Sequence, residues 1–450
     1  MRRHLQLILS LISRIMFLAV VLGVSSLPAQ AKRLKPASPE PMTIVIEHVT
    51  VVPMTSDSAA LNDATVVIIN GRIVSLSGPI PAGARRINGK GKWLIPGLTD
   101  MHVHLPSDGL PRPPKYPTEA PTMFFNTQDI MTPYIANGVT QVLNMDAVPA
   151  SVGQRNEIAR GDVLGPHMAL AAVINGGKSR GRVANTAADG RQAVRDIKAE
   201  GYDFIKVYSD LNVETFAAII DEGNMLGIKT IGHIPDAFEG NLESAFVPGF
   251  AMVAHAEEYA KHSANFTDED AGHFAQLAKK NGTWLSPTLT VMRWIASETR
   301  SLDEMKASPY LRYAHPFLQS KWVVANRYNK NSSPKLITYF DKMVDFNARL
   351  VKAFKAANVP IVAGTDALTS GVVGGFSLHE ELELLVGAGL TNQEALASAT
   401  RLSAQWIGVD SDRGTVEVGK RADLVLLDAD PLVNIANTRK IAGIFLNGRW

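Results

Sequence analysis

The middle of the chain alternates short apolar runs with longer runs that carry apolar residues at helical spacing, as at 190–200 and 213–226. Apolar runs bounded by turn residues are typical of buried strands. Strands are expected at 94–105, 138–145, 167–173, 204–209, 229–234, 252–258, 284–291 and 360–368. Eight strand–helix units predict an α/β fold, a (β/α)8 TIM barrel over 94–410, whose chemistry lies at the carboxyl ends of the strands. A doubly wound open sheet is the alternative, although no glycine-rich dinucleotide or phosphate-binding fingerprint follows any strand.

Short β segments separated by turns flank this region at both ends. The N-terminal segments are 43–46, 49–52, 64–69 and 72–75, with the hairpin signal Asn70-Gly71 between the last two. The C-terminal segments are 414–418, 423–428 and 441–450. Because a stretch of about 50 residues does not close a core of its own, we expect 42–93 and 411–450 to form one composite β-sandwich domain.

The first 31 residues have the pattern of a cleaved secretory signal. Arg2, Arg3 and Arg14 flank an apolar core at 15–24, and small residues near Ala31 form a cleavage site. A membrane anchor is the alternative, but it needs about 20 uninterrupted apolar residues. We therefore expect a secreted or periplasmic protein with a signal peptide at 1–31, a linker at 32–41 and no stable membrane span after signal removal.

Composition narrows the possible partners. The 450 residues carry a formal net charge of +2, and removing 1–31 takes away three arginines and no acidic residue, so the charge becomes −1. A near-neutral chain without basic runs has no electrostatic footprint for nucleic acid, so the expected partner is a small-molecule substrate, and a homo-oligomer is left open. The chain has no cysteine, so a metal ion would have to be held by His, a carboxylate or a modified side chain.

Two connections are longer than a barrel requires. Residues 106–122 follow the first strand and contain six prolines, and residues 295–354 follow the seventh and read as helical. Both leave strand ends at which a barrel has its active site, so they are expected to form walls or a lid of the substrate pocket. Ordinary surface insertions are the alternative.

His102 and His104 end the first barrel strand. Side chains alternate along a strand, so the two imidazoles face the same way and can grip one metal ion. Taken alone, such a pair is more often two hydrogen-bonded histidines at a strand end than a metal site. Lys206 lies inside the fourth strand, where an uncompensated ammonium is costly. It needs a carboxylate partner, a lowered pKa or conversion by CO2 into a carbamate that can bridge two metal ions, unless it extends to solvent.

Three further polar residues end apolar strands. His233 ends the fifth strand, His255 the sixth and Asp366 the eighth. In a closed barrel these ends converge with those of the first and fourth strands, which makes chance a poor explanation. Imidazole and carboxylate are ordinary ligands of zinc, and manganese, cobalt or iron are not excluded. Two ions can share a hydroxide and polarise a carbonyl, and an aspartate touching that hydroxide can take its proton and pass it to the leaving group.

These motifs together resemble the amidohydrolase superfamily and, within it, the imidazolonepropionase-like and Xaa-Pro dipeptidase-like secreted enzymes. The resemblance covers nearly the whole mature chain. It implies two divalent metal ions, most simply zinc, one held by His102, His104 and Asp366, the other by His233 and His255, with N-carboxylated Lys206 as the bridge. The motifs that carry it are PGLTDMHVH at 96–104, IKVY at 205–208, Gly232-His233, the His255 strand, GTD at 364–366 and GTVEVGKRADLV at 414–425.

Peptidases of this family read a substrate carboxylate with Arg or Tyr beyond the metal ligands. Tyr208, Tyr259 and His379 are the candidates for substrate contact here, although an aromatic residue at a barrel rim or a lone helical His is commonly structural.

The resulting hypothesis is a secreted hydrolase of an amide or peptide C–N bond, in a dipeptide or an N-acyl amino acid, in which a metal-bound hydroxide attacks and Asp366 acts as general base and acid. The same site could instead hydrolyse a lactone, a cyclic ureide or a phosphotriester. A non-catalytic periplasmic binding protein is the third reading.

Overall fold

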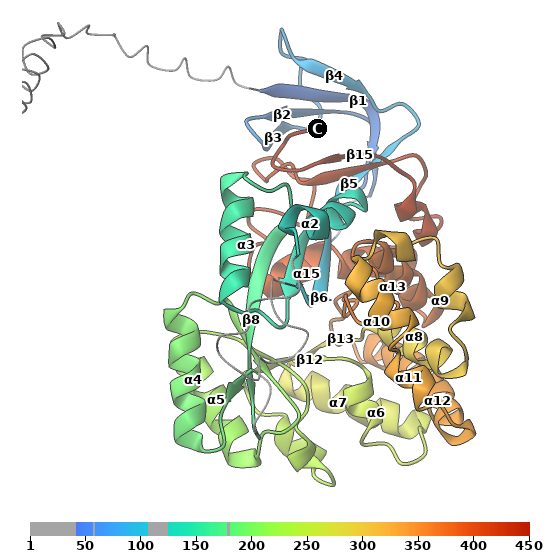
Figure 1. The fold of residues 1–450 in the computed structure, drawn as a ribbon. Helices are drawn as coiled ribbons and strands as arrows, with labels where there is room; N and C mark the ends of the chain where they lie inside the picture. Colours follow the sequence, from blue (N-terminus) through green and yellow to red (C-terminus); the bar gives the residue numbers. More distant parts are fainter. Residues whose placement is uncertain (1–41, 57–58, 107–124, 178–180) are drawn as a thin grey trace, which may run out of the picture. The chain divides into compact units, whose positions relative to one another are not determined.

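The computed structural model describes residues 42–56, 59–106, 125–177 and 181–450 (Figure 1). Thr43–Trp450 form one compact unit. The expected signal peptide, the linker and nearly all of the first long connection lie outside the described residues. Within the described part of the chain, no helix is both long and apolar enough to span a bilayer.

A parallel barrel forms the centre of this unit. Its strands pair in the order β13-β12-β11-β10-β8-β7-β6, and all of these pairs are parallel. A two-residue strand, β9, pairs with the last two residues of β8, Ile174 and Asn175. The bounds are β6 Leu98–Val103, β7 Val139–Asn144, β8 His167–Asn175, β9 Arg182–Val183, β10 Phe204–Val207, β11 Thr230–Gly232, β12 Phe250–Ala254 and β13 Trp284–Ser286.

The eighth position of the barrel is occupied by an irregular segment rather than a regular strand. On one side the amide N of Val362 donates to the carbonyl O of Leu285 over 2.9 Å, and on the other the N of Met101 donates to the O of Ala363, also over 2.9 Å. Further along, the N of Asp366 donates to the O of His102 over 2.8 Å. These bonds join the first strand to the last, so the barrel prediction is confirmed and the open sheet is wrong.

Helices alternate with the barrel strands, as the apolar spacing predicts. The predicted helices at 190–200 and 213–226 correspond to α4 (Ala187–Ala199) and α5 (Val213–Leu226). Thr186 caps α4 by accepting a bond from the N of Asp189, and Asn212 caps α5 in the same way. The other helices between strands are α2 Thr127–Ala136, α3 Pro149–Arg160, α6 Glu257–Ala260, α7 Asp268–Asn281, α13 Phe376–Gly387, α14 Asn392–Ser398 and α15 Arg401–Ile407.

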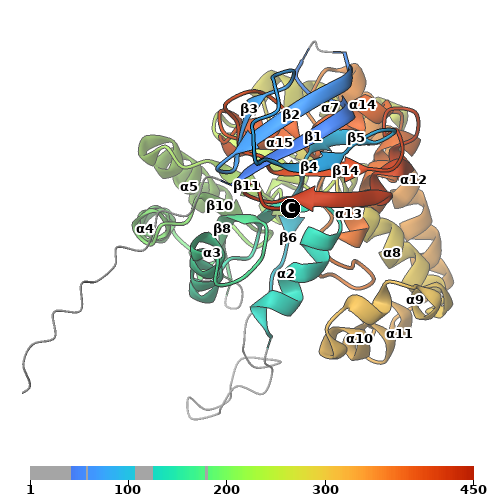
Figure 2. The same cartoon turned by 90° about the horizontal axis from the view of Figure 1, so that it is seen from above.

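The second long connection is helical, as expected. In Figure 2 its helices lie on one side of the barrel, and α3, α4 and α5 lie on the opposite side. Its elements are α8 Leu289–Arg300, α9 Asp303–Ala307, η3 Leu311–Tyr313, α10 Pro316–Val323, α11 Arg327–Lys330 and α12 Pro334–Ala356.

Strands from both chain ends form one mixed seven-stranded sheet, shown at the top of Figure 1. The order is β15-β14-β5-β1-β2-β3, and β4 pairs with the first half of β1. The strand β1 changes register between Ile46 and Val49, around His48 at φ 57°, and its two halves pair with β4 and β5 in turn. One apolar core is shared by both halves and by the C-terminal strands. The bounds are β1 Thr43–Val51, β2 Leu61–Ile69, β3 Arg72–Ser75, β4 Arg85–Asn88, β5 Trp93–Pro96, β14 Leu424–Leu427 and β15 Ile441–Phe445.

Several predicted boundaries differ from the structure. The segments predicted at 43–46 and 49–52 are one strand, 414–418 is not a strand, and β4 was not expected. The strand predicted at 94–105 divides at Gly97, so that its first part, β5, belongs to the mixed sheet and its second part, β6, belongs to the barrel. A Cβ atom at Gly97 would lie 2.1 Å from the Oγ1 of Thr140, so only glycine fits where the chain passes from the sheet to the barrel.

Candidate metal centre

The barrel interior is built in two levels. A buried apolar cluster that includes Phe204, Ile231 and Met252 fills the lower level. Lys206 and His233 follow the first two of these residues by two positions and therefore face the same way. The periodicity of the strands thus places polar side chains directly above an apolar floor, at the carboxyl ends.

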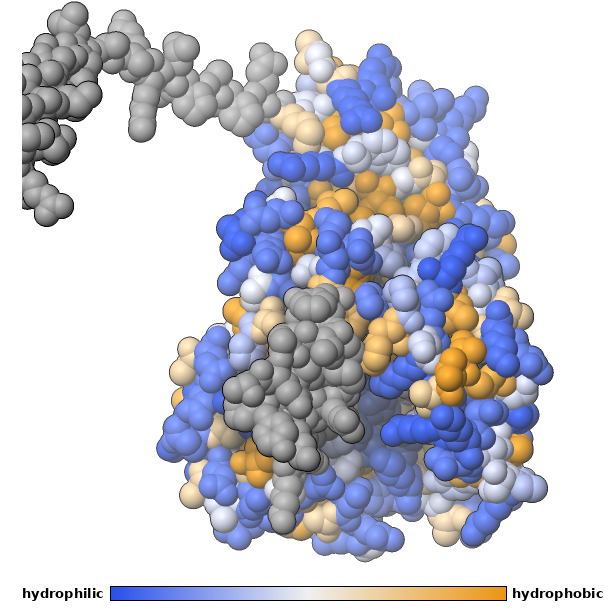
Figure 3. Space-filling view, in the orientation of Figure 1, coloured by the Kyte–Doolittle hydropathy of each residue, from blue (hydrophilic) through white to orange (hydrophobic). Residues whose placement is uncertain are grey.

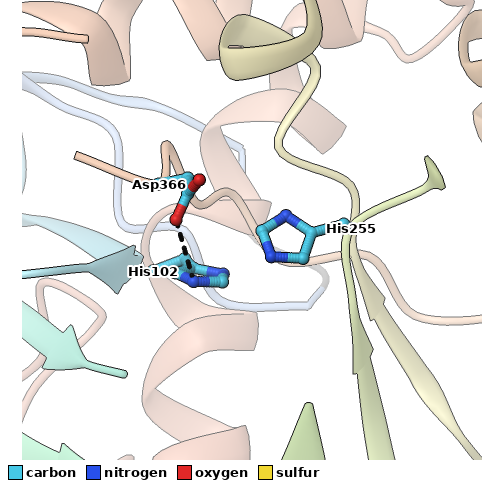
Figure 4. A group of neighbouring side chains, drawn as sticks. All are labelled: His102, His255 and Asp366. Atoms are coloured by element: carbon cyan, nitrogen blue, oxygen red, sulfur yellow. Dashed lines mark ion pairs between the residues drawn. The ribbon is translucent and has the colours of Figure 1, made fainter. Parts of the chain in front are cut away.

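Four side chains meet around one ring nitrogen. The Nε2 of His102 lies 3.2 Å from the Nε2 of His104, 3.2 Å from the Oδ1 of Asp366 and 3.2 Å from the Nζ of Lys206. The same Asp366 oxygen lies 2.8 Å from the Nε2 of His104. In Figure 4 the carboxylate of Asp366 points at the ring of His102, with His255 beside them. Ligand atoms of His102, His255 and Asp366 all lie within 4.8 Å of one another.

The remaining two histidines extend the cluster to one side. The ring centroids of His102 and His255 are 4.5 Å apart, and those of His255 and His233 are 5.0 Å apart. The Nδ1 of His255 lies 2.7 Å from the Oγ1 of Thr288. The Nδ1 of His233 lies 3.1 Å from Glu258 Oε1. Each ring is thus oriented through Nδ1, which leaves Nε2 as the atom available to a metal ion.

Backbone strain is concentrated at the same place. His255, Thr288 and Asp366 have φ values of 82°, 48° and 62°, which non-glycine residues adopt at a cost that the surrounding structure must offset. Two buried carboxylates hold these segments. Asp100 accepts a 2.7 Å bond from the Oγ1 of Thr365, the residue before Asp366. Glu381 accepts the backbone N–H groups of residues 289 and 290, which directly follow Thr288.

The charge states of the cluster suit a divalent cation. Burial lowers the pKa of His102 and His255 well below the usual value, and it also lowers the pKa of His233. Burial opposes ionisation of Asp366, but His102 and His104 outweigh it and lower the pKa of Asp366 well below its usual range. Neutral imidazoles and an ionised carboxylate are the forms that bind metal ions. The donor set therefore fits a metal site.

Lys206 lies at the centre of this arrangement. Its side chain is 1% exposed, and its Nζ lies 5.8 Å from the ring centroid of Tyr208 as well as 3.2 Å from His102. As a cation it is one of the charges that lower the pKa values of His102, His233 and His255. Converting it into an anion would reverse the sign of that interaction.

The three candidate substrate residues have different surroundings. The ring of Tyr208 lies 4.1 Å from that of His233, at the cluster. Tyr259 is fully buried against aromatic rings such as Phe354. His379 lies on α13 with its Nδ1 2.9 Å from the Oγ1 of Thr438, against the short helix η4 (Ile435–Arg439). Only Tyr208 is brought to the cluster by a contact with one of the histidines.

Arg327 is a candidate that sequence reasoning missed. It begins α11, in the second long connection, and its Nη2 donates to the Tyr328 hydroxyl over 2.6 Å. That bond raises the pKa of Arg327, and Tyr208 and Glu257 raise it further. Glu257 in turn interacts electrostatically with Asp366. The long connection therefore supplies a guanidinium that interacts electrostatically with Tyr208, the residue that contacts His233. No strand-end signal marks Arg327, because its place depends on how a helical insertion folds.

Glu298 positions α11, and it provides a test by pH. Asn326, the N-cap of α11, donates from its side chain to the Oε2 of Glu298 over 2.7 Å. Burial raises the pKa of Glu298 from 4.5 to about 7. A raised carboxyl pKa contributes stability at low pH that is lost as the pH rises through the folded-state pKa.

We therefore expect Glu298→Gln to be about 1–3 kcal/mol more stable than the parent protein at pH 8, since one pKa unit corresponds to about 1.36 kcal/mol, and to show little difference at pH 5. Thermal unfolding of both proteins between pH 5 and 8 measures this, with the exposed Glu239→Gln as the control. Parallel pH curves for the parent and Glu298→Gln would contradict the assignment.

Comparison with known proteins agrees with this fold. The amidohydrolase family profile matches residues 93–450. Imidazolonepropionase of Maricaulis maris is 35% identical over 105 residues, which is 22% of this chain and only 26% of that protein.

Two solved structures share the fold over nearly their whole length. A Xaa-Pro dipeptidase with methionine bound in its active site has a TM-score of 0.66 at 20% identity, covering 90% of this chain and 99% of that one. A prolidase complexed with N-methylphosphonate-L-proline has a TM-score of 0.66 at 19% identity, covering 90% and 98%. Since the family profile spans residues 93–450, which is most of the chain, this chain belongs to the amidohydrolase family.

Proposed function

We propose that this protein hydrolyses the amide or peptide bond of a dipeptide or an N-acyl amino acid. The observation that supports this proposal is that the guanidinium of Arg327 interacts electrostatically with Tyr208, whose ring lies 4.1 Å from that of His233 in the histidine cluster. A cationic group at that position suits a substrate whose carboxylate lies close to the scissile bond. The fold is also that of the dipeptidase and prolidase described above, which act on such bonds.

In this proposal the five ligands and Lys206 hold two divalent ions. His102, His104 and Asp366 would hold one ion, His233 and His255 the other, and a carbamate on Lys206 would join them. Zinc is the simplest choice for imidazole and carboxylate donors. Bound there, the ions would polarise the scissile carbonyl and make a water molecule nucleophilic at neutral pH.

Asp366 carries out the proton transfers. Its Oδ1 faces the histidines, and its Oδ2 accepts a 2.9 Å hydrogen bond from the Oγ1 of Thr369. With one oxygen held by the hydroxyl, the other is fixed towards the place where water and substrate meet. Ionised at neutral pH, it accepts the proton of the attacking water and returns it to the leaving nitrogen.

Arg327 binds the substrate carboxylate. A planar guanidinium suits bidentate binding of a carboxylate, and the stack on Tyr328, with the guanidinium carbon 4.7 Å from the ring centroid, orients it. Arg327→Gln is expected to raise KM for a dipeptide roughly 10- to 100-fold, because a hydrogen bond to a charged group contributes about 1.5–3 kcal/mol, while kcat changes little. Steady-state kinetics on the metal-loaded enzyme measure this.

Arg312→Gln is the matched control, because Arg312 also stacks on the tyrosine that follows it and donates to its hydroxyl. Its KM should stay at the parent value. The same substrate amidated at its C-terminus supplies the second control. Because the amide has no carboxylate, the KM for it should be the same in Arg327→Gln and in the parent protein. An equal loss on the acid and on the amide would contradict the assignment of Arg327.

The choice of bond is tested by one screen. Dipeptides, N-acyl amino acids, lactones, cyclic ureides and phosphotriesters are offered to the same metal-loaded sample. The proposal expects turnover of the first two classes. Turnover confined to lactones, ureides or phosphotriesters would be consistent with the same metal site but would contradict the proposed substrate class.

A further inference from the structure

A cavity of about 870 Å³ lies between the mixed sheet and the amino-terminal end of the barrel. The turn between β2 and β3, the residues that follow α3, and the segment after β15 line it. His167, the first residue of β8, is also part of its wall. Because the metal ligands follow the carboxyl ends of the strands, this cavity is at the opposite end of the barrel from the histidine cluster.

The polar part of the cavity wall is cationic. Its lining includes five arginines and one histidine, and no aspartate or glutamate lines it among the described residues. Three of the arginines share one carboxylate, that of Asp412. The Nη2 of Arg72 lies 2.9 Å from it, the Nε of Arg421 3.0 Å and the Nη2 of Arg413 3.1 Å.

This charge is incompletely balanced within the described part of the chain. Arg160 pairs with Asp162 at 2.7 Å, and Asp423, which interacts electrostatically with Arg413, is also engaged by His167 at 3.0 Å and by the N of Asn447 at 2.6 Å. Arg413 is 16% exposed, and its Nε is buried without a hydrogen-bond partner among the described residues. Arg449 also lines the cavity and forms no ion pair with a described carboxylate. An unsatisfied buried donor costs roughly 1–3 kcal/mol, so an anion bound here would be stabilised.

The other wall of the cavity is apolar. Leu164 and Trp450 line it and are 58% and 39% exposed. The Trp450 ring packs on Gly443, where a Cβ atom would lie 1.7 Å from the ring. Figure 3 shows hydrophobic side chains gathered near β15 on a face that is otherwise mostly hydrophilic. A ligand for this cavity therefore carries negative charge on one side and a flat apolar group on the other.

We propose that this cavity binds a small aromatic phosphate monoester. A phosphate dianion accepts bidentate hydrogen bonds from guanidinium groups such as Arg413 and Arg449. Its aromatic group packs between Trp450 and the aliphatic wall. The ligand contacts Arg449, which follows β15, and Arg413, which lies between α15 and β14, so its binding stabilises the folded state in which these segments meet.

Phenyl phosphate is the probe, added to the full-length, metal-loaded enzyme. We expect saturable binding by calorimetry at this cavity and a concentration-dependent rise in the unfolding temperature. Arg413→Gln and Arg449→Gln should each weaken the affinity at least tenfold, with kcat for the substrate unchanged. Arg85→Gln removes the same charge from an exposed position on β4 and should bind like the parent protein.

Two results would overturn the proposal. One is the absence of saturable phenyl phosphate binding to the parent protein. The other is equal affinity in the parent, Arg413→Gln and Arg449→Gln, which would place the bound phosphate elsewhere, such as at the metal centre. If Arg413→Gln does not fold, the exposed Arg449→Gln decides the question alone.

Discussion

Asp366→Asn should lower kcat by roughly 10³- to 10⁴-fold, the upper range for loss of a general acid–base group, while the enzyme keeps most of its metal. The amide retains an oxygen 2.8 Å from where the Nε2 of His104 lies in the parent protein, so a ligand atom remains. It has no basic oxygen that can take a proton from water. Turnover of a dipeptide and elemental analysis on the same samples measure the two quantities.

Asp162→Asn is the matched control, because Asp162 is an exposed aspartate that pairs with Arg160 and precedes the amino-terminal end of β8. It should match the parent in both measurements. If Asp366→Asn keeps metal and near-parental turnover, Asp366 is not the proton-transfer group. If it loses metal and activity together, Asp366 acts chiefly as a ligand.

Lys206→Met should abolish activity, with a loss of roughly 10³-fold or more, and reduce the metal content from the two ions per chain proposed above to one or none. The buried side chain lies 3.2 Å from the Nε2 of His102, where an ammonium would repel cations. A carbamate at the same position is an anion with two oxygen donors, which is the kind of ligand that a pair of divalent ions needs. Methionine fills the space and supplies neither the negative charge nor the oxygen donors.

Bicarbonate separates this prediction from a general loss of structure. Apo-enzyme made by chelation should regain activity when metal and bicarbonate are added together, and poorly when CO2 is excluded. Lys229→Met is the control variant, since Lys229 lies directly before β11 and its Nζ contacts the carbonyl O of Trp406, away from the histidines. Full reconstitution without CO2 would show that Lys206 is not carboxylated.

Much of the barrel is predictable from the sequence because its strands are short apolar runs with polar ends. His102, Lys206, His233, His255 and Asp366 each stand at such an end, and closure of the barrel brings them together. Spacing along a strand determines which face of the sheet a side chain lies on. The shared orientation of His102 and His104 could therefore be predicted from the sequence alone.

The features that were missed depend on contacts between distant segments. The electrostatic interaction of Arg327 with Tyr208 depends on how the helical connection folds in space, and no local sequence pattern encodes that path. Asp100 stands in an apolar strand, and its bonds to Thr365 become visible only once the eighth segment closes the barrel. The strand predicted at 414–418 is wrong because burial alone does not make a strand. Val416 is buried, but its N–H donates to the carbonyl O of Pro53, and this bond is not part of a sheet.

The connection at Gly97 between β5 and β6 also determines when the mixed sheet can be completed during synthesis of the chain. The strand β5 leads directly into β6 and its histidines, and its two neighbours in the sheet are β1 and β14. On the ribosome, β5 has to wait for more than 300 residues before β14 is made. Until then one edge of β5 is open to pairing with other chains. A nascent chain that ends before β14 is therefore an aggregation hazard, and the metal centre acquires its anchored first strand only near the end of translation.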